Sequence, residues 1–241
     1  MGAQLYVGAG DLSNDSGNVD TIATPRGIFD VTGLDKYAKE TLLGLAEGIL
    51  GFGAFFNTAA GQAHPILSAL PTSDEVITFA VGSTAGSPAA SMIGPQLNYD
   101  ANRPGDGSFT FSTTKAGNGY GLDWGELLTA GKVTSTGAED LASVDFGAAG
   151  TNGLVAYLHV FAFTGTSVTV TIEESSDDGG GDAFTAVTGG AFTAASAVGS
   201  QRIETADSLA VEQYLQVALT GTYSNAVLAV VVKPRDAAEI L

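Results

Sequence analysis

The chain has 241 residues, 44% of them hydrophobic, and a formal net charge of −17. This length suits one large or two ordinary domains, and the apolar content is ample for a core, which excludes a disordered chain. The absence of cysteine excludes disulfides and thiolate metal sites. The acidic charge argues against a nucleic-acid-binding protein, because such proteins neutralise phosphates with Lys and Arg.

Only 15% of the residues are charged, and small residues are abundant. This composition favours close packing against neighbouring copies.

In chain order, residues 4–7 predict a short strand, and residues 8–27 predict a long polar arm or loop, rich in Gly, Asn, Asp and Ser. The N-terminus lacks the pattern of a secretory signal, so we expect assembly in a cytoplasm.

Residues 30–57 contain the clearest helical pattern of the chain. Thr32 followed three residues later by Asp35 resembles a capping box. Apolar residues then recur three or four positions apart, at Leu34, Ala38, Leu42, Leu45 and Ile49. The spacing predicts a helix near residues 34–48, ended by glycines at 48, 51 and 53.

This helix has two interpretations: a core helix covering a sheet, or a docking element between subunits. The candidate packing and assembly residues are Leu42, Leu45, Ile49, Phe52, Phe55 and Phe56. A membrane span is disfavoured, because the apolar run over 42–56 is shorter than the roughly 20 residues required and Glu47 interrupts it.

The rest of the chain reads as strands and turns. Buried or alternating strands are predicted at 76–81 and 108–114, and the glycine-rich segment 147–153 predicts a linker. Beyond it, alternating apolar patterns predict about six strands, the spacing of a β-sandwich. These strands are 154–163, 167–173, 184–187, 201–205, 214–220 and 226–233.

Patterns of catalytic residues are missing. The two histidines, His64 and His159, lie far apart in the sequence, and no H-E-x-x-H, G-x-S-x-G or cysteine nucleophile occurs. Most carboxylates lie in polar turns. We therefore expect no enzymatic activity, no cofactor and no metal site.

The order of these features resembles a known family. The segments VITFAV, SMIGPQLNYDANRPGDGSFTFS and GNGYGLDWGELLTAG, within residues 28–135, are similar to major tail proteins of long-tailed bacteriophages, of the kind found in phages of actinobacteria. The C-terminal segments SVTVTIEESSDDGGG and YLQVALTGTYSNAVLAVVV resemble β-rich portions of the same kind of protein.

The resemblance implies a mainly β protein. Residues 1–148 would form a tail-tube-like β-sandwich or barrel with the N-terminal arm and one flanking α-helix, and residues 149–241 a C-terminal all-β sandwich. It also implies six-membered rings that stack into a tail tube in the virion. An acidic lumen would let DNA pass without specific binding.

The expected partners are further copies of the chain and other tail proteins, such as the tape measure and terminator proteins, with no membrane contact. The alternative is a virion decoration or fibre-like surface protein whose C-terminal sandwich binds capsid or glycan. A third class is a carbohydrate-binding module or adhesin.

Overall fold

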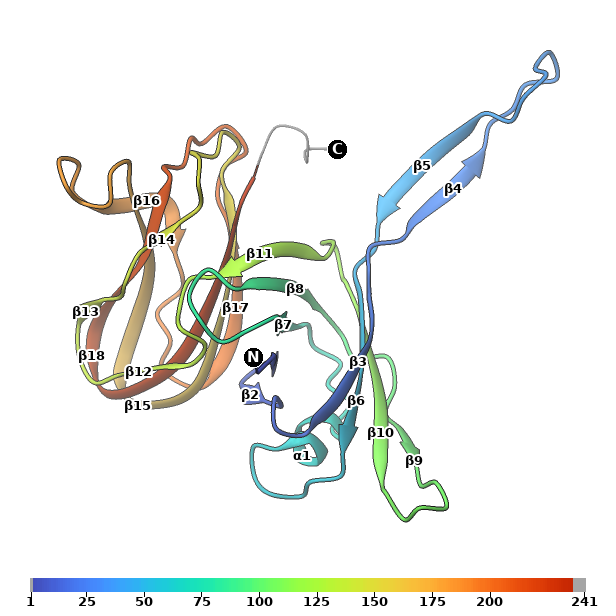
Figure 1. The fold of residues 1–241 in the computed structure, drawn as a ribbon, viewed down its shortest axis with the longest axis horizontal. Helices are drawn as coiled ribbons and strands as arrows, with labels where there is room; N and C mark the ends of the chain where they lie inside the picture. The colour runs from blue at the N-terminus through green and yellow to red at the C-terminus, as the bar shows by residue number, and fades with distance from the viewer. Residues whose placement is uncertain (1, 236–241) are drawn as a thin grey trace.

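The computed structural model describes residues 2–235 and is mainly β, as the sequence predicts, with 54% strand and 2% helix. Its strands form a twelve-stranded sheet, a four-stranded sheet and a two-stranded ribbon. The ribbon projects from the body of the molecule, to the upper right in Figure 1. In the described residues one α-helix is present, α1 (Ala63–Leu67).

The twelve-stranded sheet combines strands from both halves of the chain. Its main path is β16-β15-β18-β11-β8-β7-β1-β2, while β12, β13 and β14 pair with β18 and β17 pairs with β15. Its strands are β1 (Gln4–Val7), β2 (Gly10–Asp11), β7 (Glu75–Ala80), β8 (Pro88–Gly94), β11 (Asp123–Leu127), β12 (Val133–Ser135), β13 (Glu139–Asp140), β14 (Val144–Asp145), β15 (Leu154–Ser175), β16 (Thr185–Ala191), β17 (Gly199–Glu204) and β18 (Tyr214–Pro234).

The four-stranded sheet has the order β3-β6-β10-β9, and the ribbon consists of β4 and β5. All pairs in both are antiparallel. The strands are β3 (Ser16–Ala23), β4 (Arg26–Asp30), β5 (Thr41–Ala46), β6 (Ile49–Phe55), β9 (Asp100–Asn102) and β10 (Thr110–Ala116).

Strands β15 and β18 form one long bent pair that encloses the C-terminal core. Each spans two of the separate strands predicted from the sequence. The pairing shifts register around Gly165, which has a φ of 156°. A Cβ there would lie 2.4 Å from Tyr223 Cα, so only glycine fits this bend.

The first half of β15 is buried on both faces and joins two parts of the core. Leu154, Ala156 and Leu158 pack into the C-terminal cluster. Val155 and Tyr157 point to the other side and pack with residues of β7, β8, β11 and β18. A separate cluster, which includes Phe52 and Leu12, lies between β6, α1 and the β1–β7–β8 part of the large sheet.

The helix predicted near residues 34–48 is wrong: this segment is the loop after β4, then β5 and the turn into β6. Thr32 does not cap a helix. Its hydroxyl donates to Asp30 Oδ1 at 2.6 Å and accepts from the Glu40 backbone N–H at 2.9 Å, which closes a hairpin loop. Leu42 lies opposite Phe29 in the ribbon, so tertiary strand pairing overrides the helical spacing.

The polar arm expected over residues 8–27 is also wrong, since β2, β3 and the start of β4 occupy it. Leu12 is fully buried, and the buried Asp15 carboxylate accepts from the Ala63 N–H at 2.8 Å, at the start of α1. The division of the chain at residue 148 stays a prediction. In the described structure, segment 147–153 hydrogen-bonds to Val211 and Leu209 through the backbone.

Candidate assembly surface

One long β-hairpin runs from residue 16 to residue 55. β3 pairs with β6 from Ser16↔Ala54 to Ala23↔Ile49, and β4 continues the pairing with β5 up to Asp30↔Thr41. The backbone hydrogen bond from Glu47 N–H to Pro25 carbonyl, at 2.9 Å, links the two ladders. The base of the hairpin belongs to the four-stranded sheet. Its distal part, residues 26–46, is here called the arm (Figure 1).

The arm is almost wholly solvent-exposed and yet apolar. Every residue from 26 to 46 is exposed except the half-buried Gly44. Eight of the seventeen large apolar side chains that are exposed in the described residues lie on it. They are Ile28, Phe29, Val31, Leu34, Tyr37, Leu42, Leu43 and Leu45. An apolar patch of this density is typical of an interaction surface.

Both faces of the arm carry these side chains. Directly paired residues of an antiparallel ladder share a face, so Ile28 and Leu43 lie on one side and Phe29 and Leu42 on the other. A groove of about 630 Å³ runs along β5 and is lined by Phe29, Leu42, Leu43 and their neighbours. Neither face is covered by another element of the described chain.

Little within the subunit stabilises the arm. Its ion pairs, Lys36–Glu40 at 3.2 Å and Lys39–Asp30 at 3.6 Å, are exposed, and such pairs contribute little. The Phe29 ring covers Gly44, where an added Cβ would lie 2.9 Å from Phe29 Cε2. A two-stranded ribbon without further strands or a covering element is marginally stable in water.

The arm is also neutral in a highly acidic protein. It carries three basic side chains and three acidic ones, so the remaining residues hold the whole net charge of −17. The six charged residues of the arm are Arg26, Lys36, Lys39, Asp30, Asp35 and Glu40. Contacts through a neutral apolar element avoid the repulsion that two acidic bodies would otherwise experience.

The four-stranded sheet has two open edges, since β3 and β9 each have one partner strand in the described residues. Its inner face, with Leu50 and Phe52, packs on the core. Register places Ile49 and Phe55 on the outer face, and the other residues there are small, polar or acidic, including Asn18, Thr21, Gly51, Gly53, Ser112, Thr114, Asp100 and Asn102. The one basic residue of these four strands, Lys115, is buried and pairs with Glu75 at 2.8 Å.

An aromatic cluster lies at the opposite end of the same hairpin from the arm. Phe56, directly after β6, contacts Phe109 with ring centroids 4.9 Å apart and His64 of α1 at 4.7 Å. Phe111 and Tyr99 stack beneath at 4.2 Å, and Tyr99 Oη lies 2.7 Å from His64 Nδ1. These five residues are called the aromatic platform; Phe56 is 41% exposed and Phe109 37%.

The structure separates the six candidate assembly residues into three groups. Leu42 and Leu45 lie exposed on the arm, and Leu45 is 91% exposed. Ile49 is half-buried where the arm meets the sheet, and Phe52 is fully buried in the core. Phe55 and Phe56 lie exposed at the platform end of β6. Their role in assembly stays a prediction.

The first strand of the arm, β4, was not predicted from the sequence. Ile28, Phe29 and Val31 were not among the candidates. The signal that could have found them is the pair of apolar runs, residues 28–31 and 42–45, on either side of a polar segment rich in Asp, Lys and Glu.

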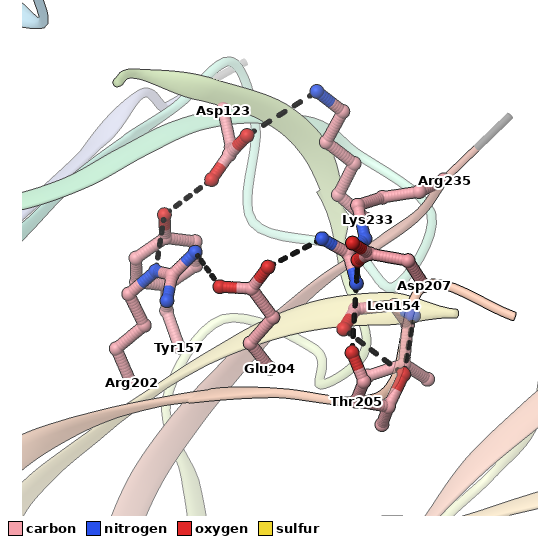
Figure 2. A network of polar contacts seen from close by, with 9 residues as sticks. All are labelled: Asp123, Leu154, Tyr157, Arg202, Glu204, Thr205, Asp207, Lys233 and Arg235. Atoms are coloured by element: carbon pink, nitrogen blue, oxygen red, sulfur yellow. Dashed lines mark hydrogen bonds and ion pairs between the residues drawn. The ribbon is translucent and has the colours of Figure 1, made fainter. Parts of the chain in front are cut away.

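A polar network ties together four strands near the junction of the two halves (Figure 2). Asp123 of β11 accepts from the hydroxyl of Tyr157 of β15 and pairs with Lys233 of β18 at 3.2 Å. On β17, Arg202 lies over the Tyr120 ring, with Cζ 3.8 Å from the centroid, and its Nε lies 3.4 Å from the Tyr157 hydroxyl. Burial, followed by the Asp123 charge, raises the pKa of Tyr157, so the hydroxyl stays a donor.

The same network continues to the end of the described chain. Glu204 pairs with Arg202 at 2.8 Å and with Arg235, which in turn pairs with Asp207 at 2.8 Å. Burial opposes ionisation of Glu204, but its two guanidinium partners lower the pKa of this carboxyl overall. The network therefore fixes β17 and the end of β18 against β11 and β15, and its charges are mutually compensated.

A buried histidine links β15 to the N-terminal half. His159 Nδ1 lies 2.8 Å from the Gly8 carbonyl and Nε2 lies 2.9 Å from Thr78 Oγ1. A carbonyl can only accept, so Nδ1 carries the proton and Nε2 accepts from Thr78. Burial, with a contribution from the nearby Lys115 charge, lowers the pKa of His159 to about 4, so the ring is neutral.

Within residues 2–235, no group of three or more His, Asp or Glu side chains is arranged to hold a metal ion. The helix in that range is too short to cross a membrane. The arm carries the largest group of exposed apolar side chains in this part of the chain, and these side chains are not buried within the subunit.

No protein-family model matches the chain, and no curated protein matches it either. Solved structures align with it over nearly the whole length. The first is SPP1 Dit (gp 19.1), described as a paradigm of hub adsorption apparatus in Gram-positive infecting phages. It has 14% identity and a TM-score of 0.33 over 96% of this chain and 99% of that chain.

The second is the phage P2 baseplate in its activated conformation with Ca. It has 10% identity and a TM-score of 0.29, and covers 98% of this chain and 99% of that chain. The same baseplate with Sr has 8% identity and a TM-score of 0.27, and covers 97% and 99%. Similarity at this level carries neither a fold nor a function to this chain.

Proposed function

We propose that the chain is a structural subunit of a long-tailed bacteriophage virion, which polymerises as stacked rings of six copies into the tail tube. The observation that carries the proposal is the long hairpin of residues 16–55. One half of it forms an open sheet edge, and the other half projects as an uncovered apolar arm. Such an element is completed by another copy of the chain.

The energetics favour burial of the arm in an assembly. Covering one large apolar side chain stabilises a complex by roughly 1.5–3 kcal/mol. The arm offers eight such side chains, and part of this gain is offset by the loss of translational and rotational freedom on association. A contact repeated in every subunit of a polymer multiplies the remaining stabilisation.

The four-stranded sheet supports a ring with a channel. Open edges are sites of strand pairing, and a closed barrel is the arrangement that removes them. If β3 of one copy continues the sheet from β9 of the next, the largely polar outer face of the sheet surrounds the lumen. That face carries Asp100 and Asn18 and no exposed basic side chain from its four strands, so DNA passes without binding.

The C-terminal half would then lie outside the ring, as part of the wall or as an external decoration. It is joined to the N-terminal half through the large sheet and the polar network, so it moves with the ring. Other tail proteins, such as tape measure and terminator proteins, would contact the inside and the ends of the tube. This function involves no catalysis, no cofactor and no membrane.

Negative-stain electron microscopy of the purified protein tests the proposal. We expect rings with a central channel that stack into tubes at high protein concentration. Isolated rings without stacking would indicate a single-ring tail component in place of the tube subunit. A protein that stays monomeric at every concentration would contradict self-assembly and favour a decoration or fibre-like role.

A further inference from the structure

The two main exposed apolar surfaces of the hairpin lie at its opposite ends. The arm extends beyond Pro25 and Glu47, whereas Phe55 and Phe56 mark the open end of the base, next to Phe109. In Figure 1 the arm points up and to the right, and α1 with the β9–β10 turn lies at the lower end of the same strands. The two surfaces of one subunit therefore cannot meet each other.

We propose that the arm of one copy docks on the aromatic platform of the next copy along the strand axis. This inference rests on the proposed self-assembly and assigns the two halves of one contact. A surface that joins a different surface on an identical copy is heterologous, and repetition of it builds an open stack. Because the arm and the platform lie at opposite ends of one hairpin, all copies in that stack point in the same direction.

The chemistry of the two surfaces is complementary. The arm presents aliphatic side chains and the cations Lys36 and Lys39, whose side chains are 44% and 64% exposed. The platform presents the rings of Phe56 and Phe109, which can receive both aliphatic groups and ammonium groups on their faces. The arm is moreover neutral, so it approaches the acidic body of a neighbour without net repulsion.

The reach of the arm agrees with an inter-ring contact. From Arg26 to the loop near Asp35 the chain spans ten residues, and strands rise about 3.3 Å per residue, so the arm extends up to about 33 Å beyond the sheet. The arm therefore extends well past the end of its own sheet, toward the platform end of the next copy along the strand axis.

Cross-linking tests this inference, and the protein suits it because the native chain contains no cysteine. The substitution Ala38→Cys labels the arm tip, and Thr58→Cys labels the border of the platform. Both positions are exposed, and neither is one of the large apolar, cationic or ring side chains that carry the proposed contact. Single variants are mixed and treated with a short bismaleimide.

We expect covalent dimers from the mixture of Ala38→Cys and Thr58→Cys subunits, few from either alone, and a ladder of multimers from the chain that carries both. Adding Leu45→Asp to the Ala38→Cys subunit should abolish the dimers. A third label, Ser196→Cys on the exposed surface of the C-terminal half, should not react with Ala38→Cys.

Four results would overturn the inference. Dimers of Ala38→Cys alone would mean that arms contact arms, and dimers with Ser196→Cys would place the arm on the C-terminal half. Rings or tubes seen by microscopy without any arm-to-platform product would leave the proposed function standing and reject this contact. A wild-type protein that never assembles would reject both.

Discussion

His159 shows how a single buried residue couples the two halves of the chain to pH. The ring hydrogen-bonds to Gly8 and Thr78 in the N-terminal half, and Tyr6 lies beside it with ring centroids 5.5 Å apart. Lys115 is the nearby cation, and it opposes protonation of His159. The junction is therefore built for a neutral imidazole.

Stability should fall as the pH is lowered from about 6.5 to about 4. The folded pKa of His159, about 4, lies below the ordinary histidine value of 6.5, so in this window the unfolded chain binds a proton that the folded chain excludes. The loss from this one group amounts to up to about 3 kcal/mol. Urea unfolding of wild type and His159→Gln at several pH values measures it.

Carboxylates also titrate in this range, so the informative quantity is the difference between the two proteins. The wild type should lose more stability than the variant between pH 6.5 and pH 4. Parallel pH profiles would mean that His159 is not held neutral by the fold.

At this scale the partners of His159 could not be predicted from the sequence, because Gly8 and Thr78 are remote in the chain. Of the candidate assembly residues, Phe52 and Leu45 look alike in the sequence, yet one is fully buried and the other 91% exposed. In β6 the side chains alternate between the core face and the outer face, which buries Phe52, whereas Leu45 lies on the uncovered arm. The helical spacing of apolar residues over 34–49 obscured this strand pattern in the sequence.

At the scale of elements, the bent pair β15–β18 is the feature on which the C-terminal core depends. Gly221 has a φ of 124°, and a Cβ on it would lie 2.3 Å from the Ser167 carbonyl oxygen. The backbones of β15 and β18 therefore approach each other closely at Gly221, and both strands bend over the core cluster that contains Val168 and Leu219.

Gly221→Ala should therefore destabilise the protein by about 2–3 kcal/mol, since it adds both backbone strain and a steric clash. Gly199→Ala is the matched control: Gly199 lies in β17, and nothing lies within 4 Å of an added Cβ. We expect that control to be neutral or slightly stabilising. Equal urea midpoints for the two variants would contradict this account of the bend.

The elements of the C-terminal half were largely predictable, because their apolar alternation is regular. Segments 154–163 and 167–173 were recognised as strands, and the structure joins them into β15. The arm was mispredicted as a helix because Leu34, Leu42 and Leu45 have helical spacing. What decides between helix and hairpin there is the pairing of β5 with β4, which local propensity does not encode.

At the scale of the whole molecule, charge and apolar surface are separated. The arm is neutral and apolar, whereas the body carries the net charge of −17. In the proposed assembly, this separation keeps free subunits apart through their bodies and directs association to the arm. The mainly β class was predicted from the sequence, but the projection of one hairpin from the body was not, because it depends on which strands the core can cover.

Leu45 is the position at which the central claim can be tested most directly. The substitution Leu45→Asp places a charge on a 91% exposed arm residue, so the subunit should stay folded, within about 0.5 kcal/mol of wild type. Assembly should be lost, because a carboxylate would have to be buried against the neighbouring copy. Val198→Asp, at an exposed apolar residue outside the arm, is the matched control.

The decisive measurement is sedimentation velocity of these two variants and wild type at equal concentration, with circular dichroism as the check of folding. We predict large assemblies for wild type and Val198→Asp, and a folded monomer for Leu45→Asp. A folded Leu45→Asp protein that sediments like wild type would contradict the claim that the arm drives assembly.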